Sequence, residues 1–521
     1  MWNDTLPYDS RRAPVLADNM VATSQPLAAQ AGLEMLYRGG NAVDAALAAA
    51  ITLTVVEPTS NGLGSDAFAL LWDGTQLLGI NGSGRAPAAW TRERFAGHER
   101  MPRLGWDAVT VPGAVSVWVE LSQRHGKLPF ADLFDAAIHY AEQGYAVGPV
   151  TARQWREDAG LFDAYPEFAR HFGAAPAAGQ RVRLPATAAS LREIAASHGA
   201  SFYQGDLAAR MAAAAAADGG ALSAEDLASH RADWVTPIAQ PYRDVVLHEI
   251  PPNGQGLAAQ IALAILAHRE VPPVDSADAI HQQIEAMKLA LGAAAQHFAD
   301  PRAMLVSPEQ LLEPGSVARA AARITRHAMA LPPVSLPISH DTVYLTAADA
   351  SGMMVSFIQS NFHGFGSGIV VPDTGIALQN RGHGFSLDPA HPNCVAPGKR
   401  PFHTIIPGFV TRDGQALLSF GVMGGHMQAQ GHVQMVTRLF DYGQNPQAAS
   451  DAPRWRIEPD FSVAIESNFE PAVAAELSAR GHTIKIDRSP RGFGGAQLIL
   501  RSGHGYVGGS DHRKEGLAVG F

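Results

Sequence analysis

Two adjacent glycines, Gly424 and Gly425, stand where backbone groups could take part in chemistry. They follow a short apolar stretch, residues 417–422, that predicts a strand, and they precede a stretch with apolar residues on one helical face. Glycines at the start of a helix expose backbone N–H groups at its positive end, where they can stabilise a developing oxyanion. The pair would also suit a tight turn that needs glycine only for its torsion angles. Both interpretations can hold together.

Patterns typical of several other chemistries are missing from the sequence. It has no G-x-S-x-G elbow of the common serine hydrolases and no phosphate-binding Walker loop. The glycine-bearing stretch at 364–368 has the wrong spacing for a dinucleotide loop. The 21 histidines include no H-E-x-x-H motif, and there is no Cys/His cluster. His363, His383, His391 and His403 share a region but are widely spaced. We therefore expect neither a cofactor nor a metal site.

Charge and composition exclude several partners. The 39 Lys and Arg against 49 Asp and Glu give a net charge of −10, which argues against nucleic acid and anionic membranes. The single cysteine, Cys394, cannot form an internal disulfide. The first sixteen residues contain no apolar signal-peptide core, and the longest apolar run, 42–56, is too short to span a bilayer. The sequence predicts a cytoplasmic protein.

The elements that would position a site change in character along the chain. Ser24-Gln25-Pro26 predicts a helix start with Ser24 as the cap, and Asn41 is expected to cap a second helix over 42–56. Two short strands should flank the turn Asp73-Gly74. From about 107 to 310 the pattern is mainly helical.

Strand patterns dominate after about Pro337. Residues 342–348 and 353–358 predict two strands joined by a hairpin turn. Segment 314–338 ends in a proline-rich stretch and is the best candidate for an exposed connection. The chain is therefore expected to be of the mixed α/β class.

Several sequence blocks, which occur in family order and span nearly the whole chain, resemble the γ-glutamyltransferase family. They lie at residues 21–58, 109–115, 250–256, 341–356, 399–407, 421–426, 451–455 and 508–520. The resemblance implies an N-terminal-nucleophile hydrolase, made as one chain and folded as a four-layer α/β/β/α sandwich. It further implies self-cleavage into a large and a small subunit that remain one intertwined unit.

Thr342 occupies the position of the family's nucleophile, so the resemblance implies a cut between Asp341 and Thr342 and subunits of residues 1–341 and 342–521. A threonine hydroxyl needs a base. The α-amine freed by the cut has a pKa of about 7.7–8.0 and lies on the same residue. The intact chain should therefore be inactive. Without the resemblance, Thr342 would be read as an ordinary strand threonine.

Three further positions follow from the same resemblance. Gly424 and Gly425 match the family's oxyanion-hole glycines, and Asn361 matches a residue near the nucleophile. The Asn361 amide could orient substrate, or it could be satisfied within its own loop.

This chain departs from glutamyl-specific members at the positions that bind the substrate. Ser83 stands where those members have an arginine for the α-carboxylate, and Arg85 lies two positions later. Gly384 takes the place of the acidic residue that binds the α-amine, and Arg381 replaces a neutral amide. The family's two paired serines become His403 and Thr404.

These changes favour an anion without an amine, because a guanidinium repels an ammonium group. Arg381 and Arg85 would be its partners, although either could instead form a structural salt bridge. The chain is most similar to the oxamate amidohydrolase subgroup, so we expect hydrolysis of a small anionic amide with release of ammonia. The alternatives are glutathione hydrolysis or γ-glutamyl transfer, and an uncleaved protein that only binds a ligand. The processed subunits could form a homo-oligomer.

Overall fold

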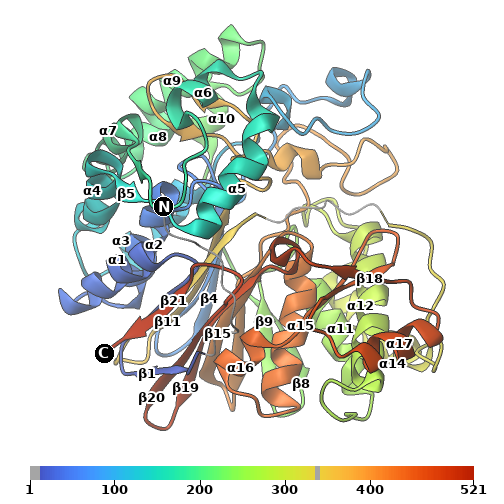
Figure 1. Ribbon diagram of the computed structural model, residues 1–521. Helices are drawn as coiled ribbons and strands as arrows, with labels where there is room; N and C mark the ends of the chain where they lie inside the picture. Colours follow the sequence, from blue (N-terminus) through green and yellow to red (C-terminus); the bar gives the residue numbers. More distant parts are fainter. Residues whose placement is uncertain (1–11, 335–340) are drawn as a thin grey trace.

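Two seven-stranded sheets, packed face to face between two layers of helices, form the four-layer sandwich of this protein (Figure 1). The computed structural model describes residues 12–334 and 341–521. The first sheet has, in order, β1 (Val15–Ala17), β20 (Gly505–Ser510), β19 (Gly495–Ser502), β15 (Gln415–Met423), β14 (Gly408–Arg412), β9 (Val245–Glu249) and β8 (Ile238–Tyr242). The second has β21 (Leu517–Gly520), β2 (Met20–Thr23), β10 (Val343–Ala348), β11 (Met354–Ser360), β3 (Asp66–Trp72), β4 (Leu77–Asn81) and β7 (Asp233–Val235).

The helices divide between the two outer faces. The second sheet packs against the group that is drawn in blue to green in Figure 1: α1 (Pro26–Tyr37), α2 (Ala42–Val56), α3 (Ala114–His125), α4 (Asp135–Gln143), α5 (Pro149–Ala159), α6 (Pro166–Phe172), α7 (Pro185–Ala196), α8 (Ala200–Gln204), α9 (Asp206–Ala217) and α10 (Ala224–Ser229). The first sheet carries α11 (Gly256–Ala267), α12 (Ala277–His297), α13 (Pro308–Leu311), α14 (Pro314–Ala322), α15 (Met427–Phe440), α16 (Pro446–Asp451) and α17 (Pro471–Ala479).

Small sheets complete the described chain. One contains β16 (Trp455–Ile457), β17 (Val463–Glu466) and β18 (Ile484–Asp487), and two others are the pairs β5 (Tyr145–Ala146) with β6 (Arg181–Val182) and β12 (Val370–Val371) with β13 (Ile376–Ala377). No helix among the described residues is long and apolar enough to cross a membrane.

The central strand β10 shows why the sheets are buried on both faces. Val343, Leu345 and Ala347 pack in the core between the second sheet and its helices, whereas Tyr344 and Ala348 pack in the core between the two sheets. Alternate residues of a strand point to opposite faces, so a run of apolar residues is required. The strand lies between β2 and β11, so strands from before and after Thr342 are interleaved in this sheet.

Local sequence signals account for the helices that flank β10. Asn41 forms a capping box with Asp44 at the start of α2, as predicted. The Ser24 prediction was wrong: Gln25 caps α1, and the Ser24 hydroxyl donates instead to Glu57 at 2.5 Å. Segment 314–338 is not simply an exposed connection, because 314–322 form α14 and bury Val317. Residues 335–338 lie outside the described chain.

Candidate active site

Thr342 lies immediately before β10 and is fully buried. Its Oγ1 donates to the carbonyl oxygen of Asp341 at 2.5 Å and lies 3.1 Å from the Oγ of Ser360. Ser360 ends β11, and the register of β10 on β11 brings it opposite Thr342. The Ser360 hydroxyl also lies 3.1 Å from the same carbonyl oxygen. Two hydroxyl groups therefore surround one peptide carbonyl, the one that precedes the threonine.

Gly424 and Gly425 form the turn between β15 and α15. Both have positive φ, +119° and +59°, a region that favours glycine. A Cβ on Gly424 would lie 2.9 Å from the Cα of Gly494, so the close backbone approach also requires glycine there. Gln428, in the first turn of α15, places its Nε2 3.5 Å from the Thr342 hydroxyl. The glycine turn and the threonine are therefore neighbours at the N-terminus of α15.

Asn361 follows Ser360 directly and is fully buried. Its side-chain oxygen accepts from Ser65 at 2.8 Å, and its amide nitrogen donates to the carbonyl of Phe365 at 3.2 Å. Its side chain thus ties two loops together beside the threonine.

Arg381 is 1 % exposed, and only some of its guanidinium nitrogens form hydrogen bonds within the described chain. Nη1 donates to Thr404 Oγ1 at 2.8 Å, and Cζ lies 4.3 Å from the ring centre of Phe362. Within the described chain, Nε and Nη2 have no hydrogen-bond partner. Burial lowers the pKa of Arg381 to about 9, against the opposing effect of Asp66. The side chain is still cationic near neutral pH, and two of its donors could serve an anion.

Asp66 is a site residue that the sequence analysis missed. Its Oδ1 accepts from the backbone N–H groups of Gly84 and Gly113 at 3.2 Å, and its Oδ2 lies 3.0 Å from His403 Nε2. Burial raises the pKa of Asp66 to about 7, an effect that Arg381 counters, and burial holds the pKa of His403 well below its usual range. The backbone N–H of Ile405 donates to His403 Nδ1 at 3.4 Å, so the proton of the neutral ring lies on Nε2, which donates to Asp66. The one available signal was a lone acid at the start of an apolar strand.

Ser83 and Arg85 are held by other groups. The buried Ser83 hydroxyl bonds to Asn81 Oδ1 at 2.7 Å. Arg85 pairs with Asp233 at 3.2 Å and with Asp300 at 3.8 Å, and about a third of its side chain is exposed. The guanidinium of Arg85 is thus engaged by two carboxylates.

Two short paths of contacts connect Arg381 with Thr342. Along the first, Gln255 Nε2 donates to the carbonyls of Thr404 at 2.5 Å and Gly425 at 2.8 Å. Along the second, Phe362 lies under the guanidinium, and its backbone N–H donates to Ser360 Oγ at 2.8 Å. A hydroxyl, a glycine turn and a cation are therefore gathered into one buried cluster, a set suited to attack on a carbonyl next to an anionic group.

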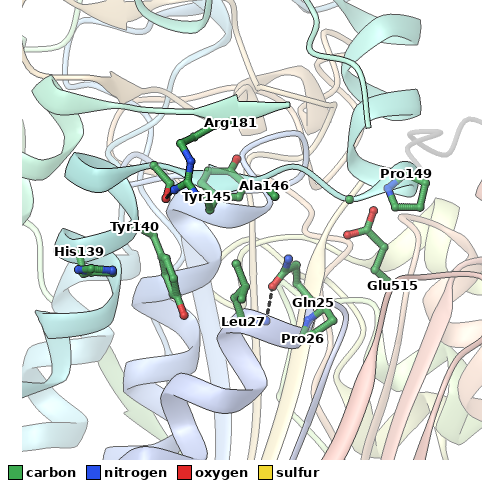
Figure 2. A pocket seen from close by; sticks show the side chains of 12 residues that line it. Gln25, Pro26, Leu27, His139, Tyr140, Tyr145, Ala146, Pro149, Arg181 and Glu515 are labelled. Atoms are coloured by element: carbon green, nitrogen blue, oxygen red, sulfur yellow. Dashed lines mark hydrogen bonds between the residues drawn. The ribbon is translucent and has the colours of Figure 1, made fainter. Parts of the chain in front are cut away.

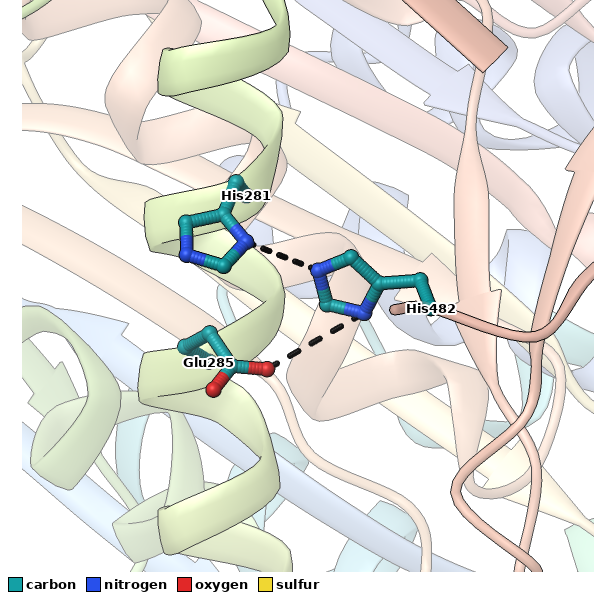
Figure 3. A group of neighbouring side chains, drawn as sticks. All are labelled: His281, Glu285 and His482. Atoms are coloured by element: carbon teal, nitrogen blue, oxygen red, sulfur yellow. Dashed lines mark hydrogen bonds and ion pairs between the residues drawn. The ribbon is translucent and has the colours of Figure 1, made fainter. Parts of the chain in front are cut away.

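A second cluster of titratable residues, His281, Glu285 and His482, joins α12 to the segment after α17 (Figure 3). Two histidines and a carboxylate can bind Zn²⁺. Here, however, Lys288 Nζ lies 2.8 Å from Glu285 and 3.3 Å from His482 Nδ1. His281 Nδ1 lies 2.8 Å from His482 Nε2, and His281 Nε2 bonds to the carbonyl of Thr325. Because a buried ammonium group already neutralises the carboxylate, we interpret the cluster as a structural network.

Replacing Lys288 by Met should destabilise the protein by roughly 3–5 kcal/mol, because it would leave the buried Glu285 carboxylate without its cation. Urea unfolding would measure this loss, with Thr342→Ala as the background so that the expected cut before Thr342 cannot divide the chain. Lys288→Met combined with Glu285→Gln should recover much of it, since no charge is then stranded. Equal stability of the single and double variants would contradict the interpretation.

A cavity of about 520 Å³ opens between α1, α4, α5 and the C-terminal segment (Figure 2). Its two charged side chains serve helix ends: Glu515 accepts from the backbone N–H of Thr151 at 2.8 Å, and Arg181 donates to the carbonyl of Gly144 at 2.5 Å. These contacts explain the charges of the cavity as helix caps.

Comparisons with known proteins identify relatives of the whole chain. The gamma-glutamyltranspeptidase family model matches residues 28–521. An oxamate amidohydrolase proenzyme from Klebsiella pneumoniae is 37 % identical over 97 % of this chain and 99 % of its own length. A glutathione hydrolase-like YwrD proenzyme from Bacillus subtilis is 35 % identical over 96 % and 98 %. The crystal structure of a cephalosporin acylase from Bacillus halodurans has a TM-score of 0.96 and 48 % identity, covering 100 % of this chain and 99 % of that one.

Proposed function

Because the chain belongs to the gamma-glutamyltranspeptidase family, and the two relatives described above are proenzymes of amide hydrolases, we propose that it cuts itself before Thr342. The cut protein then hydrolyses a small anionic amide such as oxamate and releases ammonia. The observation that carries the proposal is the buried Thr342 hydroxyl, 2.5 Å from the carbonyl oxygen of the peptide bond to be cut. The products are residues 1–341 and 342–521. The relatives support two subunits from one precursor.

After the cut, the amine of Thr342 accepts the proton of its own hydroxyl as Oγ1 attacks the substrate carbonyl. The N–H groups of Gly424 and Gly425 hold the oxyanion, which suits their place at the start of α15. The amine then passes the proton to the leaving nitrogen, ammonia departs, and water releases the acyl group. Before the cut the same nitrogen is an amide and cannot act as a base. This is why the intact chain is inactive on substrate.

Arg381 supplies the preference for an anion. Its Nε and Nη2 have no hydrogen-bond partner in the described chain, so a carboxylate on the acyl side of the substrate would satisfy both. Thr404 steadies the guanidinium through Nη1. Gly384 supplies no acidic side chain for an α-amine, which disfavours a glutamyl group. In this proposal Arg85 is a structural residue, because Asp233 and Asp300 hold it.

A second candidate is hydrolysis of a larger acyl amide. The 48 % identity with a cephalosporin acylase favours it. It would use the same threonine and glycine turn, and it differs only in the size of the acyl group. Glutathione hydrolysis stays the third candidate, supported by the name of the Bacillus subtilis relative.

The test is a side-by-side assay on the purified, self-cleaved protein. Release of ammonia is followed with oxamate, and release of glutamate is followed with glutathione. With a cephalosporin that carries an anionic side chain, release of the free β-lactam nucleus is followed. We expect ammonia from oxamate and no glutamate. Substantial glutamate release would contradict the role given to Arg381 and Gly384. Turnover of the cephalosporin alone would assign the larger acyl substrate.

A further inference from the structure

The carboxylate of Asp341 is anchored on both of its oxygens. Arg491 approaches Oδ1 with Nη2 at 2.8 Å and Nε at 3.1 Å, and the backbone N–H of Gly364 donates to Oδ2 at 3.0 Å. The Asp341 side chain is only 8 % exposed. A side chain bound at both ends of its carboxylate has few rotamers left, and this fixes the peptide group to which it is attached.

Arg491 is itself held in place. Its Nη2 also pairs with Asp158 at 2.6 Å and its Nη1 with Glu157 at 2.8 Å, both at the C-terminal end of α5. The turn that carries Arg491 continues to Gly494, against which Gly424 packs. The guanidinium is therefore held by α5, and the turn that carries it packs against the glycine turn.

We propose that Arg491 is a positioning residue for self-cleavage, which anchors the Asp341 side chain and so aligns the scissile carbonyl with the Thr342 hydroxyl and with Ser360. The inference rests on the proposed function and adds a residue that the cut requires. It concerns alignment alone: Arg491 and the Gly364 N–H fix the carboxylate of Asp341, and the inference gives that carboxylate no part in proton transfer.

Self-cleavage begins with attack by the Thr342 hydroxyl. The Thr342 oxygen forms a bond to the carbonyl carbon of Asp341 and loses its proton, while the bond from that carbon to the Thr342 nitrogen breaks and the nitrogen takes up a proton. The product is an ester. One water molecule then hydrolyses the ester to the new C-terminal main-chain carboxylate of Asp341 and the Thr342 hydroxyl, and the free amine of Thr342 remains. Fixing the carbonyl matters most in the first step, where a displacement of about 1 Å can cost on the order of 100-fold in rate.

The charges around Arg491 predict how the variants should behave. Three carboxylates, those of Asp341, Asp158 and Glu157, share this one guanidinium. Asp341→Asn keeps the size of the side chain but gives up the charge. Arg491→Met removes the guanidinium, and Arg491→Lys keeps its charge without its planar geometry. Arg156→Met is the matched control, because it removes an exposed guanidinium from the same helix, α5, whereas the ion pairs of Arg491 are with Glu157, Asp158 and Asp341.

The experiment follows conversion of the 55 kDa chain into two fragments after a pulse of synthesis. Mass spectrometry then locates the new N-terminus. Asp341→Asn and Arg491→Met should each slow cleavage roughly 10- to 100-fold, Arg491→Lys less, and the control Arg156→Met by no more than about twofold. The double variant Asp341→Asn, Arg491→Met should be no slower than the slower single variant, because one interaction is lost in all three. Because residues in contact also couple in stability, the coupling reports alignment only where the uncut variants melt at the temperature of the Thr342→Ala chain, and a lowered melting temperature would indicate a structural role.

The outcomes separate the two proposals. Cleavage before Thr342 in the wild type, together with cleavage within about twofold of that rate in both single variants, would overturn the role of Arg491 alone. The same holds if the effects of the two single variants simply multiply in the double variant. A wild-type chain that stays whole, or is cut elsewhere, would overturn the proposed function and this inference with it. Thermal unfolding of the whole chains shows whether a slow variant is folded.

Discussion

Thr342→Ala should leave a single 55 kDa chain on a denaturing gel and lower amide turnover at least about a thousandfold. The change removes the hydroxyl that attacks the Asp341 carbonyl, so no amine is freed and no base is made for the second reaction. The cavity left by one hydroxyl and one methyl group is small, so the fold should persist. Gel electrophoresis and an ammonia assay measure the two losses independently.

Thr342→Ser is the matched variant, because it keeps the hydroxyl and removes only the methyl group. It should still be cut and should retain measurable turnover. Turnover by an uncut Thr342→Ala chain would show that another residue is the nucleophile. Cleavage of that chain without turnover would separate self-processing from catalysis, and would contradict the shared role of Thr342.

Arg381→Met should lower kcat/KM for oxamate roughly 100-fold, because it removes a buried cation whose hydrogen bonds to an anionic substrate are charge-assisted. Oxamide, the neutral amide of almost the same shape, should be affected far less. The wild type should therefore prefer oxamate, and the variant should lose that preference. Kinetics on both substrates measure the change as a ratio of specificities.

One side effect of Arg381→Met needs its own control. The change leaves Asp66 buried beside His403 without the stronger of its two nearby cations, Arg381 and Arg400, and this alone can destabilise the site. The double variant Arg381→Met, Asp66→Asn removes the stranded charge. It should recover stability but not the preference for oxamate. Recovery of that preference would show that Arg381 acts through Asp66 and does not bind the substrate carboxylate.

Local signals in the sequence were enough to predict many elements of the fold. The helix over 42–56 and the strands around Asp73-Gly74 are confirmed, because a capping asparagine, a terminating proline and a turn pair act over a few residues. The Ser24 cap failed because the partner of that hydroxyl, Glu57, lies 33 residues away. The helical part of 314–338 was missed because the prolines at its end outweighed the amphipathic stretch before them.

The residues of the site likewise fall into two groups, those that the sequence indicated and those that it could not. The family resemblance pointed to Thr342, Gly424 and Gly425, and the structure gathers them at the start of α15. The resemblance could not show that Arg85 pairs with Asp233 and Asp300, or that two N–H donors of Arg381 have no hydrogen-bond partner in the described chain. Asp66 was missed because its partner His403 is 337 residues away in the chain, and no short-range pattern records such a pair. Charge pairing across that distance becomes visible only when the sheets are assembled.

The strand order of the second sheet has a consequence for the mature protein. Strand β10 lies between β2 and β11, and β11 lies beside β3, so the two products of a cut before Thr342 would share one sheet. Until that cut, folding involves one molecule. Afterwards, recovery of the native state requires two chains to meet, so the melting temperature of the matured enzyme would depend on its concentration. Self-processing therefore gives up reversible folding for activity: a molecule that unfolds in dilute solution would be lost, whereas its precursor could refold.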